Sequence, residues 1–161
     1  MSEERAVAAL DASGITYEIH RHGRVSSLAE AAAALGVDPS GVVKTLVVRR
    51  GEDDFLLVLV PGDRTISWPK LRALLGVQRL SMPDAAVAQQ VTGYERGTIT
   101  PFGTLRPWPV IADSRVTAGP VSIGAGAHGV GATVDGAELV RVTGAQVADV
   151  TDAAAATTAA G

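Results

Sequence analysis

The segment Gly93–Gly103, here called the central loop, carries residues that could do chemistry through their main chain. Its three glycines allow close approach to a ligand and, with Pro101, prevent a regular helix. Pro101 also restricts Thr100 to an extended conformation, so the amides of Thr98, Ile99 and Thr100 can point outward unpaired. Such amides suit a carbonyl, an oxyanion or a ribose hydroxyl. A turn that binds nothing has the same composition, so the loop alone leaves both interpretations open.

Lys44 is a second candidate, because it interrupts an apolar, β-branched run over residues 42–49 that predicts a strand. A lysine in such a strand either extends past the edge of the sheet or faces a cavity that holds an anionic or polar group. The sequence alone favours the edge slightly over the cavity.

Other reactive residues do not meet the requirements of a metal or nucleophile site. His20 and His22 would share one face of a strand and could hold a metal, but surface histidines at a strand end are the favoured interpretation. Ser122, His128 and Asp113 supply the residue types of a catalytic triad without a serine elbow or an ordering partner. Asp113 is better interpreted as a structural turn or cap residue. We therefore expect neither a metal nor a cofactor.

Composition limits the class of protein. The chain has 161 residues, 47% of them hydrophobic, a net charge of −3 and no cysteine. This length suits one domain with an aliphatic core, and the lack of cysteine excludes a disulfide framework and a thiolate metal site. No signal peptide or bilayer-spanning run is evident, so we expect a cytoplasmic protein. A nucleic-acid partner would need a local basic patch, for which Arg64, Lys70, Arg72 and Arg79 are candidates.

Short helices mixed with strands predict a single α+β domain. Expected helices cover residues 4–12, 28–35, 68–75, 83–91 and 135–143, and expected strands cover residues 15–20, 42–49, 55–60, 78–82, 108–113, 121–124, 132–134 and 145–150. Residues 124–131 contain Gly-x-Gly without a following helix, which excludes a dinucleotide site and suggests a hairpin end with bare backbone. The Ala/Thr-rich residues 151–161 are expected to fray.

The order of these parts resembles the YbaK/ProX family, stand-alone relatives of the editing domain inserted in bacterial prolyl-tRNA synthetases. The resemblance covers residues 15–152 and rests on five segments: Val43-Lys44-Thr45-Leu46, Val60-Pro61-Gly62-Asp63, residues 92–103, Gly124-x-Gly126, and residues 144–150. It implies a curved, mixed β-sheet or partial barrel flanked by short helices, with a cleft between the lysine strand and the two glycine-rich loops. The expected domain is residues 1–152, followed by a flexible tail over residues 153–161.

The resemblance also implies roles for particular residues. Lys44 would hold the aminoacyl-adenosine end by charge, and Gly97-Thr98-Ile99-Thr100-Pro101 matches the family's G-x-x-x-P loop, whose amides would face the ester carbonyl or the terminal ribose. His128 stands where some alanine-editing members carry a histidine, whereas Thr45 departs from the asparagine expected beside the lysine. The substrate-binding residues expected from the resemblance are Thr45, Gly103, Gly124, Gly126 and His128.

The function that the resemblance implies is hydrolysis in trans of a small amino acid wrongly esterified to a tRNA. Alanine is the first expectation, then cysteine or serine and threonine, with tRNA(Pro) as the tRNA. The expected partner is the tRNA acceptor end, with an aminoacyl-tRNA synthetase as a possible second partner and no membrane. An esterase of small aminoacyl esters and a non-catalytic binding protein of the same fold are the alternatives. The oligomeric state stays open.

Overall fold

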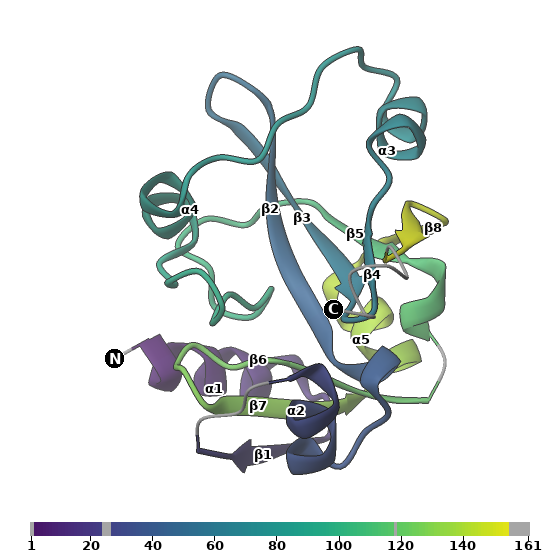
Figure 1. The fold of residues 1–161 in the computed structure, drawn as a ribbon. Coiled ribbons are helices and arrows are strands. Elements are labelled where there is room, and N and C mark those ends of the chain that lie inside the picture. The colour runs from purple at the N-terminus through teal and green to yellow at the C-terminus, as the bar shows by residue number, and fades with distance from the viewer. Residues whose placement is uncertain (1, 24–26, 118, 155–161) are drawn as a thin grey trace.

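The computed structural model describes residues 2–23, 27–117 and 119–154, and Figure 1 shows the arrangement of their helices and strands. The helices are α1 (Ser2–Ser13), α2 (Leu28–Leu35), α3 (Trp68–Leu75), α4 (Ala85–Thr92) and α5 (Gly136–Thr143). The strands are β1 (Tyr17–Arg21), β2 (Val43–Gly51), β3 (Asp54–Pro61), β4 (Arg64–Ile66), β5 (Val110–Asp113), β6 (Pro120–Gly124), β7 (Val130–Asp135), β8 (Gln146–Ala148) and β9 (Thr151–Ala153). Two 3-10 turns, η1 (Pro39–Gly41) and η2 (Ser114–Thr117), complete the elements.

Helices α2 to α5 begin and end at local capping residues. Before each helix, a serine or aspartate side chain accepts a hydrogen bond from the amide three residues later, which satisfies an otherwise unpaired donor. Each helix ends at a glycine with a left-handed φ, a conformation that glycine adopts without strain. The C-terminal cap of α4 is Gly93, which is also the first residue of the central loop.

The long hairpin of β2 and β3 forms one side of a mixed sheet with the order β2-β3-β5-β8. Strand β2 pairs antiparallel with β3, whereas β5 pairs parallel with β3 and with β8. Strand β2 is therefore an edge strand of this sheet. A second, antiparallel sheet has the order β1-β7-β6 and lies beside one end of β2, with α1 and α2 nearby (Figure 1).

The two faces of the β2–β3 hairpin bury different clusters. Val43 and Val47 belong to the face that packs toward the second sheet, α1 and the central loop. Val48 belongs to the opposite face, which packs against Leu71 of α3. Because side chains alternate along a strand, Thr45 lies on the first face and Lys44 on the second.

The structure confirms a mixed α+β fold and corrects three expectations. Residues 78–82 do not form a strand; only Ser81 makes a bridge, with Arg49. Residues 151–153 form β9 instead of fraying, because β4 supplies a pairing partner far away in sequence, and the expected domain boundary at residue 152 falls inside this strand. Residues 155–161 of the expected tail lie outside the described residues. The sheets of the described chain form no closed barrel, so "partial barrel" is a loose description.

Each helix within the described ranges is too short or too polar to cross a lipid bilayer.

Candidate functional site

A cavity of about 510 Å³ lies beside the edge strand β2. Its walls come from β2, α2, the β6–β7 hairpin and the central loop, and also include His22 and three residues in and before α4: Met82, Pro83 and Ala88. Most of the wall is apolar, and Leu35, Val43 and Ile123 are examples. A cavity of this size and character matches the usual dimensions of a small-molecule site.

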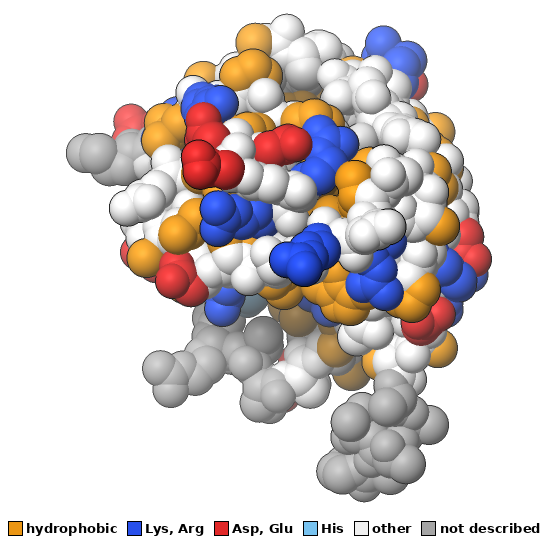
Figure 2. All heavy atoms as spheres, turned by 90° about the horizontal axis from the view of Figure 1, so that it is seen from above, with side chains coloured by type: hydrophobic (Ala, Val, Ile, Leu, Met, Phe, Trp, Pro, Cys, Tyr) orange, Lys and Arg blue, Asp and Glu red, His pale blue; other side chains and the backbone are white. Residues whose placement is uncertain are grey.

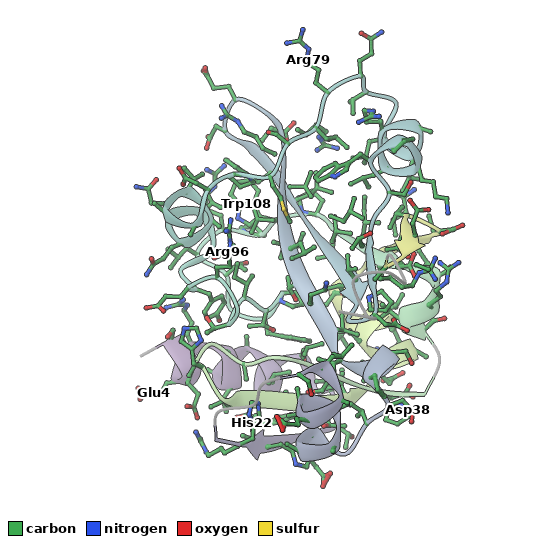
Figure 3. All side chains as sticks on the ribbon, viewed as in Figure 1. Glu4, His22, Asp38, Arg79, Arg96 and Trp108 are labelled. Carbon is green, nitrogen blue, oxygen red and sulfur yellow. The ribbon has the colours of Figure 1, made fainter. Side chains whose placement is uncertain are left out.

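The polar wall residues are of two kinds. His22, Lys44 and Arg96 supply cationic or basic groups, and Thr45 and Ser122 supply hydroxyls. Arg96 is a residue of the central loop, and Figure 3 places His22 on the side of α2. Among the described residues, no aspartate or glutamate belongs to the wall. The cavity is therefore suited to an electron-rich or anionic group.

Lys44 lies at the rim of the cavity on β2 and is exposed. Its Nζ donates a hydrogen bond to the carbonyl oxygen of Arg64 at 3.3 Å. Within the described residues it forms no ion pair with a carboxylate, so its charge is available to a ligand. Lys44 is therefore exposed on an edge strand and belongs to the cavity wall, whereas strand alternation places its side chain on the face opposite Thr45.

The central loop lies across the cavity from β2, and Gly97 and Ile99 form part of the wall. The side chains of Thr98 and Thr100 are buried behind it, and neither these threonines nor Pro101 belongs to the wall. The amide of Thr98 donates to the carbonyl of Glu95 at 2.9 Å, so the expectation that this amide is unpaired is wrong. In the described part of the chain, the amides of Ile99 and Thr100 have no hydrogen-bond acceptor.

Contacts that the sequence did not predict fix the two ends of the central loop. Arg5 of α1 donates through Nε to the carbonyl of Gly103 and through Nη2 to that of Gly93, each at 2.7 Å. Its guanidinium carbon lies 4.6 Å from the ring centroid of Tyr94. The fully buried Tyr94 donates to the carbonyl of Phe102 at 2.5 Å, and burial raises the pKa of its hydroxyl. No local pattern marks Arg5, because its partners lie about ninety residues away.

The glycines of the β6–β7 hairpin allow main chains to meet. A Cβ on Gly124 would lie 2.6 Å from the carbonyl oxygen of Ile99, so glycine lets the central loop pack directly on β6. Gly126 plays a similar part against α1, where a Cβ would lie 2.6 Å from the carbonyl oxygen of Ser2. Gly124 belongs to the cavity wall, whereas Gly126 and Gly103 do not.

His128 lies outside the wall, although its neighbours Ala127 and Gly129 belong to it. Its Nε2 is 3.0 Å from Oε2 of Glu95, and both side chains are largely exposed. The pair links the β6–β7 hairpin to the central loop. His20 lies near Glu18, and no group of three potential metal ligands occurs within the described ranges.

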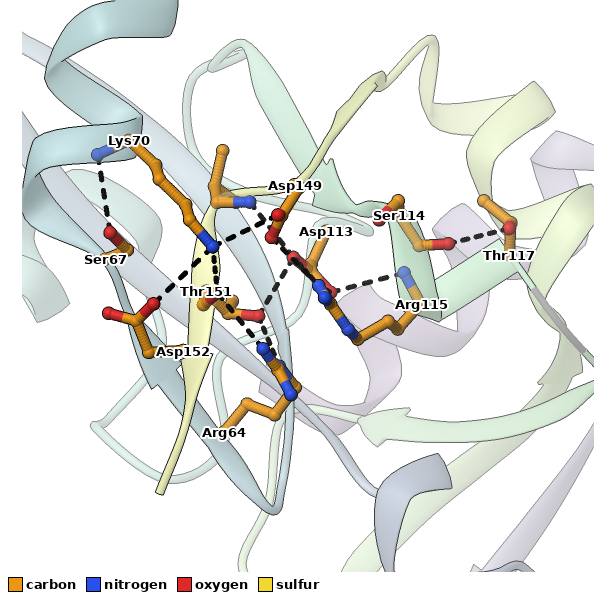
Figure 4. Close-up of polar contacts among 11 residues, drawn as sticks. Arg64, Ser67, Lys70, Asp113, Ser114, Arg115, Thr117, Asp149, Thr151 and Asp152 are labelled. Atoms are coloured by element: carbon orange, nitrogen blue, oxygen red, sulfur yellow. Dashed lines mark hydrogen bonds and ion pairs between the residues drawn. The ribbon is translucent and has the colours of Figure 1, made fainter. Parts of the chain in front are cut away.

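Asp113 has a structural role, as the sequence suggested. Its buried carboxylate accepts hydrogen bonds from the amide of Val150 at 3.1 Å and from Oγ1 of Thr151 at 3.0 Å, and it pairs with Arg115 (Figure 4). Arg115 also pairs with Asp149, where hydrogen bonds from Arg115 and Lys70 lower the pKa of Asp149 to about 2. This network joins the last strand to the sheet and leaves Asp113 unable to orient His128.

The fold and this cavity define a small α+β domain with a largely apolar cavity that is lined by an edge strand carrying a lysine and by a glycine-rich loop. Residues 22–142 match the model of the aminoacyl-tRNA editing domain, and the chain belongs to that family.

Solved structures and curated proteins agree with this assignment. The chain is similar to a candidate trans-editing enzyme for prolyl tRNA synthetase, with a TM-score of 0.84, 28% identity, and coverage of 94% of this chain and 97% of that one. It is 32% identical over 101 residues to the proline–tRNA ligase of Bacillus licheniformis and 36% identical over 90 residues to that of Trichlorobacter lovleyi. These matches cover 63% and 56% of this chain but only 17% and 16% of the ligases.

Proposed function

We propose that this protein is a trans-acting aminoacyl-tRNA deacylase that removes a small, wrongly attached amino acid, with tRNA(Pro) as its substrate tRNA. The observation that carries the proposal is that Lys44 of β2 and Gly97 and Ile99 of the central loop line one cavity. Similarity to a candidate trans-editing enzyme over almost its whole length supports action in trans. A role in tRNA editing suits a cytoplasmic protein.

The proposed reaction needs no nucleophile from the protein. A water molecule adds to the ester carbonyl carbon, and the resulting tetrahedral oxyanion accepts a hydrogen bond from the central-loop amide of Ile99, a wall residue whose amide has no other acceptor among the described residues. The bond to the ribose oxygen then breaks, and the proton from the water passes to that oxygen. The products are a free amino acid and an intact tRNA end.

Lys44 has the charge needed to hold the nucleotide end. Lys44 belongs to the cavity wall, and its Nζ has only a neutral carbonyl as a partner among the described residues, so a terminal phosphate or an electron-rich ribose can replace or share that contact. Arg96 supplies a second cation to the same wall. Basic groups around the cavity favour a tRNA substrate over a small free ester, which would gain less from them.

A surface beyond the cavity supports contact with the body of a tRNA. Figure 2 shows several lysine and arginine side chains across the end of the molecule where Arg79 lies (Figure 3). Arg72 and Arg79 form no ion pair with a carboxylate in the described residues, whereas Lys70 and Arg64 donate hydrogen bonds to Thr151 of β9. Of the four basic residues expected to form a patch, only Arg72 and Arg79 are therefore without such contacts among the described residues.

An editing site for small amino acids that is separate from the synthetase pocket also has a physical rationale. An apolar synthetase pocket distinguishes side chains that differ by one or two methylene groups by only about 10- to 200-fold, so rejection by binding alone is incomplete. A separate cavity that hydrolyses the smaller product corrects the remaining errors. The synthetase whose errors are corrected would be the natural source of the substrate.

The test is hydrolysis of tRNA(Pro) charged in turn with alanine, cysteine, serine and proline. We expect release of a small non-cognate amino acid, sparing of proline, and a loss of at least about 100-fold in the Lys44→Ala variant. Arg49→Ala is the matched control, because Arg49 is an exposed cation of the same strand outside the cavity wall.

Two outcomes would contradict the proposal. Inactivity of the wild-type protein on every charged tRNA would favour a non-catalytic binding protein. Equal hydrolysis of free aminoacyl esters and of charged tRNA would favour an esterase that does not use the tRNA.

A further inference from the structure

A continuous series of hydrogen bonds joins the C-terminal strand β9 to Lys44 of β2. The buried carboxylate of Asp113 accepts a hydrogen bond at 3.0 Å from Oγ1 of Thr151 in β9 (Figure 4). The same Oγ1 accepts from Nε of Arg64 in β4 at 2.7 Å. The carbonyl oxygen of Arg64 in turn accepts from Nζ of Lys44 at 3.3 Å. The series therefore begins inside the sheet and ends at a residue of the cavity wall.

Thr151 is the centre of this series, and both its side chain and its main chain take part. The residue is fully buried, and its carbonyl oxygen accepts from Nη2 of Arg64 at 3.2 Å and from Nζ of Lys70 at 3.1 Å. A carboxylate only accepts, so the Thr151 hydroxyl donates to Asp113 and its lone pairs are left for Arg64. The direction of each hydrogen bond is thereby fixed, and the guanidinium of Arg64 is held by two bonds to one residue.

The main chain of β4 is also placed by the C-terminal segment. Within the described ranges, β4 pairs with β9 and with no other strand. The amide of Ala154 donates at 3.2 Å to the carbonyl of Asp63, directly before β4, and the amide of Ser67, directly after β4, donates at 2.8 Å to the carbonyl of Val150. Both ends of β4 are therefore tied to the C-terminal segment, and with them the carbonyl that Lys44 contacts.

We infer that Thr151 and Arg64 are positioning residues for Lys44, so that β9 holds in place the cation that would bind the nucleotide end. This inference rests on the proposed function. Lysine has a flexible four-carbon stem, and ordering such a side chain when a ligand binds lowers the affinity. An ammonium group has three donors, so Nζ can keep its bond to the Arg64 carbonyl while it contacts a phosphate or a ribose.

Neither the composition of this segment nor the family match assigns Thr151 such a role. The Ala/Thr-rich residues 151–161 were expected to fray, and β9 lies beyond residues 22–142, which match the model of the editing domain. The role follows from the pairing of β9 with β4 and from the hydrogen bonds of the Thr151 hydroxyl.

The experiment is a double-mutant cycle between Thr151→Val and Lys44→Ala. Calorimetry measures binding of tRNA(Pro) that carries alanine through a non-hydrolysable 3′-amide. Thr151→Val removes the hydroxyl and keeps the β-branched shape. It should weaken binding by about 2- to 10-fold, the effect of ordering one long side chain on binding. It should have no effect in the Lys44→Ala protein, because the residue through which it acts is then absent.

Three further variants separate positioning from a general effect on the fold. Thr151→Ser keeps the hydroxyl and should bind as the wild type does. Arg64→Lys keeps the charge but lacks the planar fork that bonds the hydroxyl and the carbonyl of Thr151, so it should reproduce the loss. Thr143→Val is the matched control and should bind normally, because its hydroxyl donates within α5 and the residue lies outside the cavity wall.

Every outcome bears on the inference. If thermal unfolding shows that Thr151→Val does not fold, the cycle is run with Arg64→Lys. An equal loss of binding with and without Lys44 would show that β9 acts through the fold, which would overturn the inference and leave the deacylase proposal intact. Unchanged binding in both Thr151→Val and Arg64→Lys would overturn it as well. A wild-type protein that neither binds nor deacylates the charged tRNA would instead refute the proposed function.

Discussion

Gly124→Ala is the substitution that most directly tests how the central loop is positioned. The added Cβ would lie 2.6 Å from the carbonyl oxygen of Ile99 and 3.1 Å from that of Thr98. Ordinary contacts of this kind begin at 3.4 Å, so the loop would have to move away from β6 by about 0.8 Å. The obstacle is main chain, and it cannot rotate away as a flexible side chain could.

The expected loss follows from that displacement. A shift of nearly 1 Å in groups that position a reacting carbonyl can lower the rate by about 100-fold. Crowding of a packed contact also lowers the free energy of unfolding by about 1 to 3 kcal/mol. We therefore expect Gly124→Ala to reduce deacylation by one to two orders of magnitude, about 10- to 100-fold, in a protein that still folds.

Single-turnover deacylation and chemical denaturation would measure the two effects separately. Gly51→Ala is the matched control, because Gly51 also has no left-handed φ and its added Cβ would meet only Cβ of Asp54, at 3.8 Å. This control should keep wild-type activity. Wild-type activity in Gly124→Ala would refute the reasoning, and so would an equal loss in Gly51→Ala.

Two further predictions concern the supports of the site and of the C-terminal strand. Arg5→Met should lower the free energy of unfolding by about 2 kcal/mol, because two charge-assisted hydrogen bonds to Gly93 and Gly103 are lost. The same variant should show reduced deacylation. An unchanged free energy of unfolding in chemical denaturation would contradict this prediction. Asp149 has a pKa of about 2 in the folded protein, below its ordinary 3.8, so its contribution to stability is present above pH 4 and is lost as the pH falls toward 2. Asp149→Asn should remove that part of the acid dependence in thermal melts between about pH 2 and 4, and an unchanged profile would show that Arg115 does not stabilise the charged form.

Much of the local structure could be predicted because its causes lie within a few residues. A serine or aspartate before each of α2 to α5 and a glycine after it define the helix with little help from the rest of the fold. Alternating or continuous β-branched runs likewise defined β2 and β3. The exception, residues 78–82, has a strand-like composition but no neighbour that pairs along its length.

The sequence by itself also identified Lys44 and the central loop as candidate parts of one site, from their residue types and from their order along the chain. Only the tertiary structure decided which atoms face the cavity. Burial of Thr98, the hold of Arg5 on Gly93 and Gly103, and the meeting of Thr45 with the strand of Ser122 all depend on contacts between segments far apart in the chain. Such contacts leave no local pattern, because their energy comes from packing and hydrogen bonds that exist only after the sheets have come together.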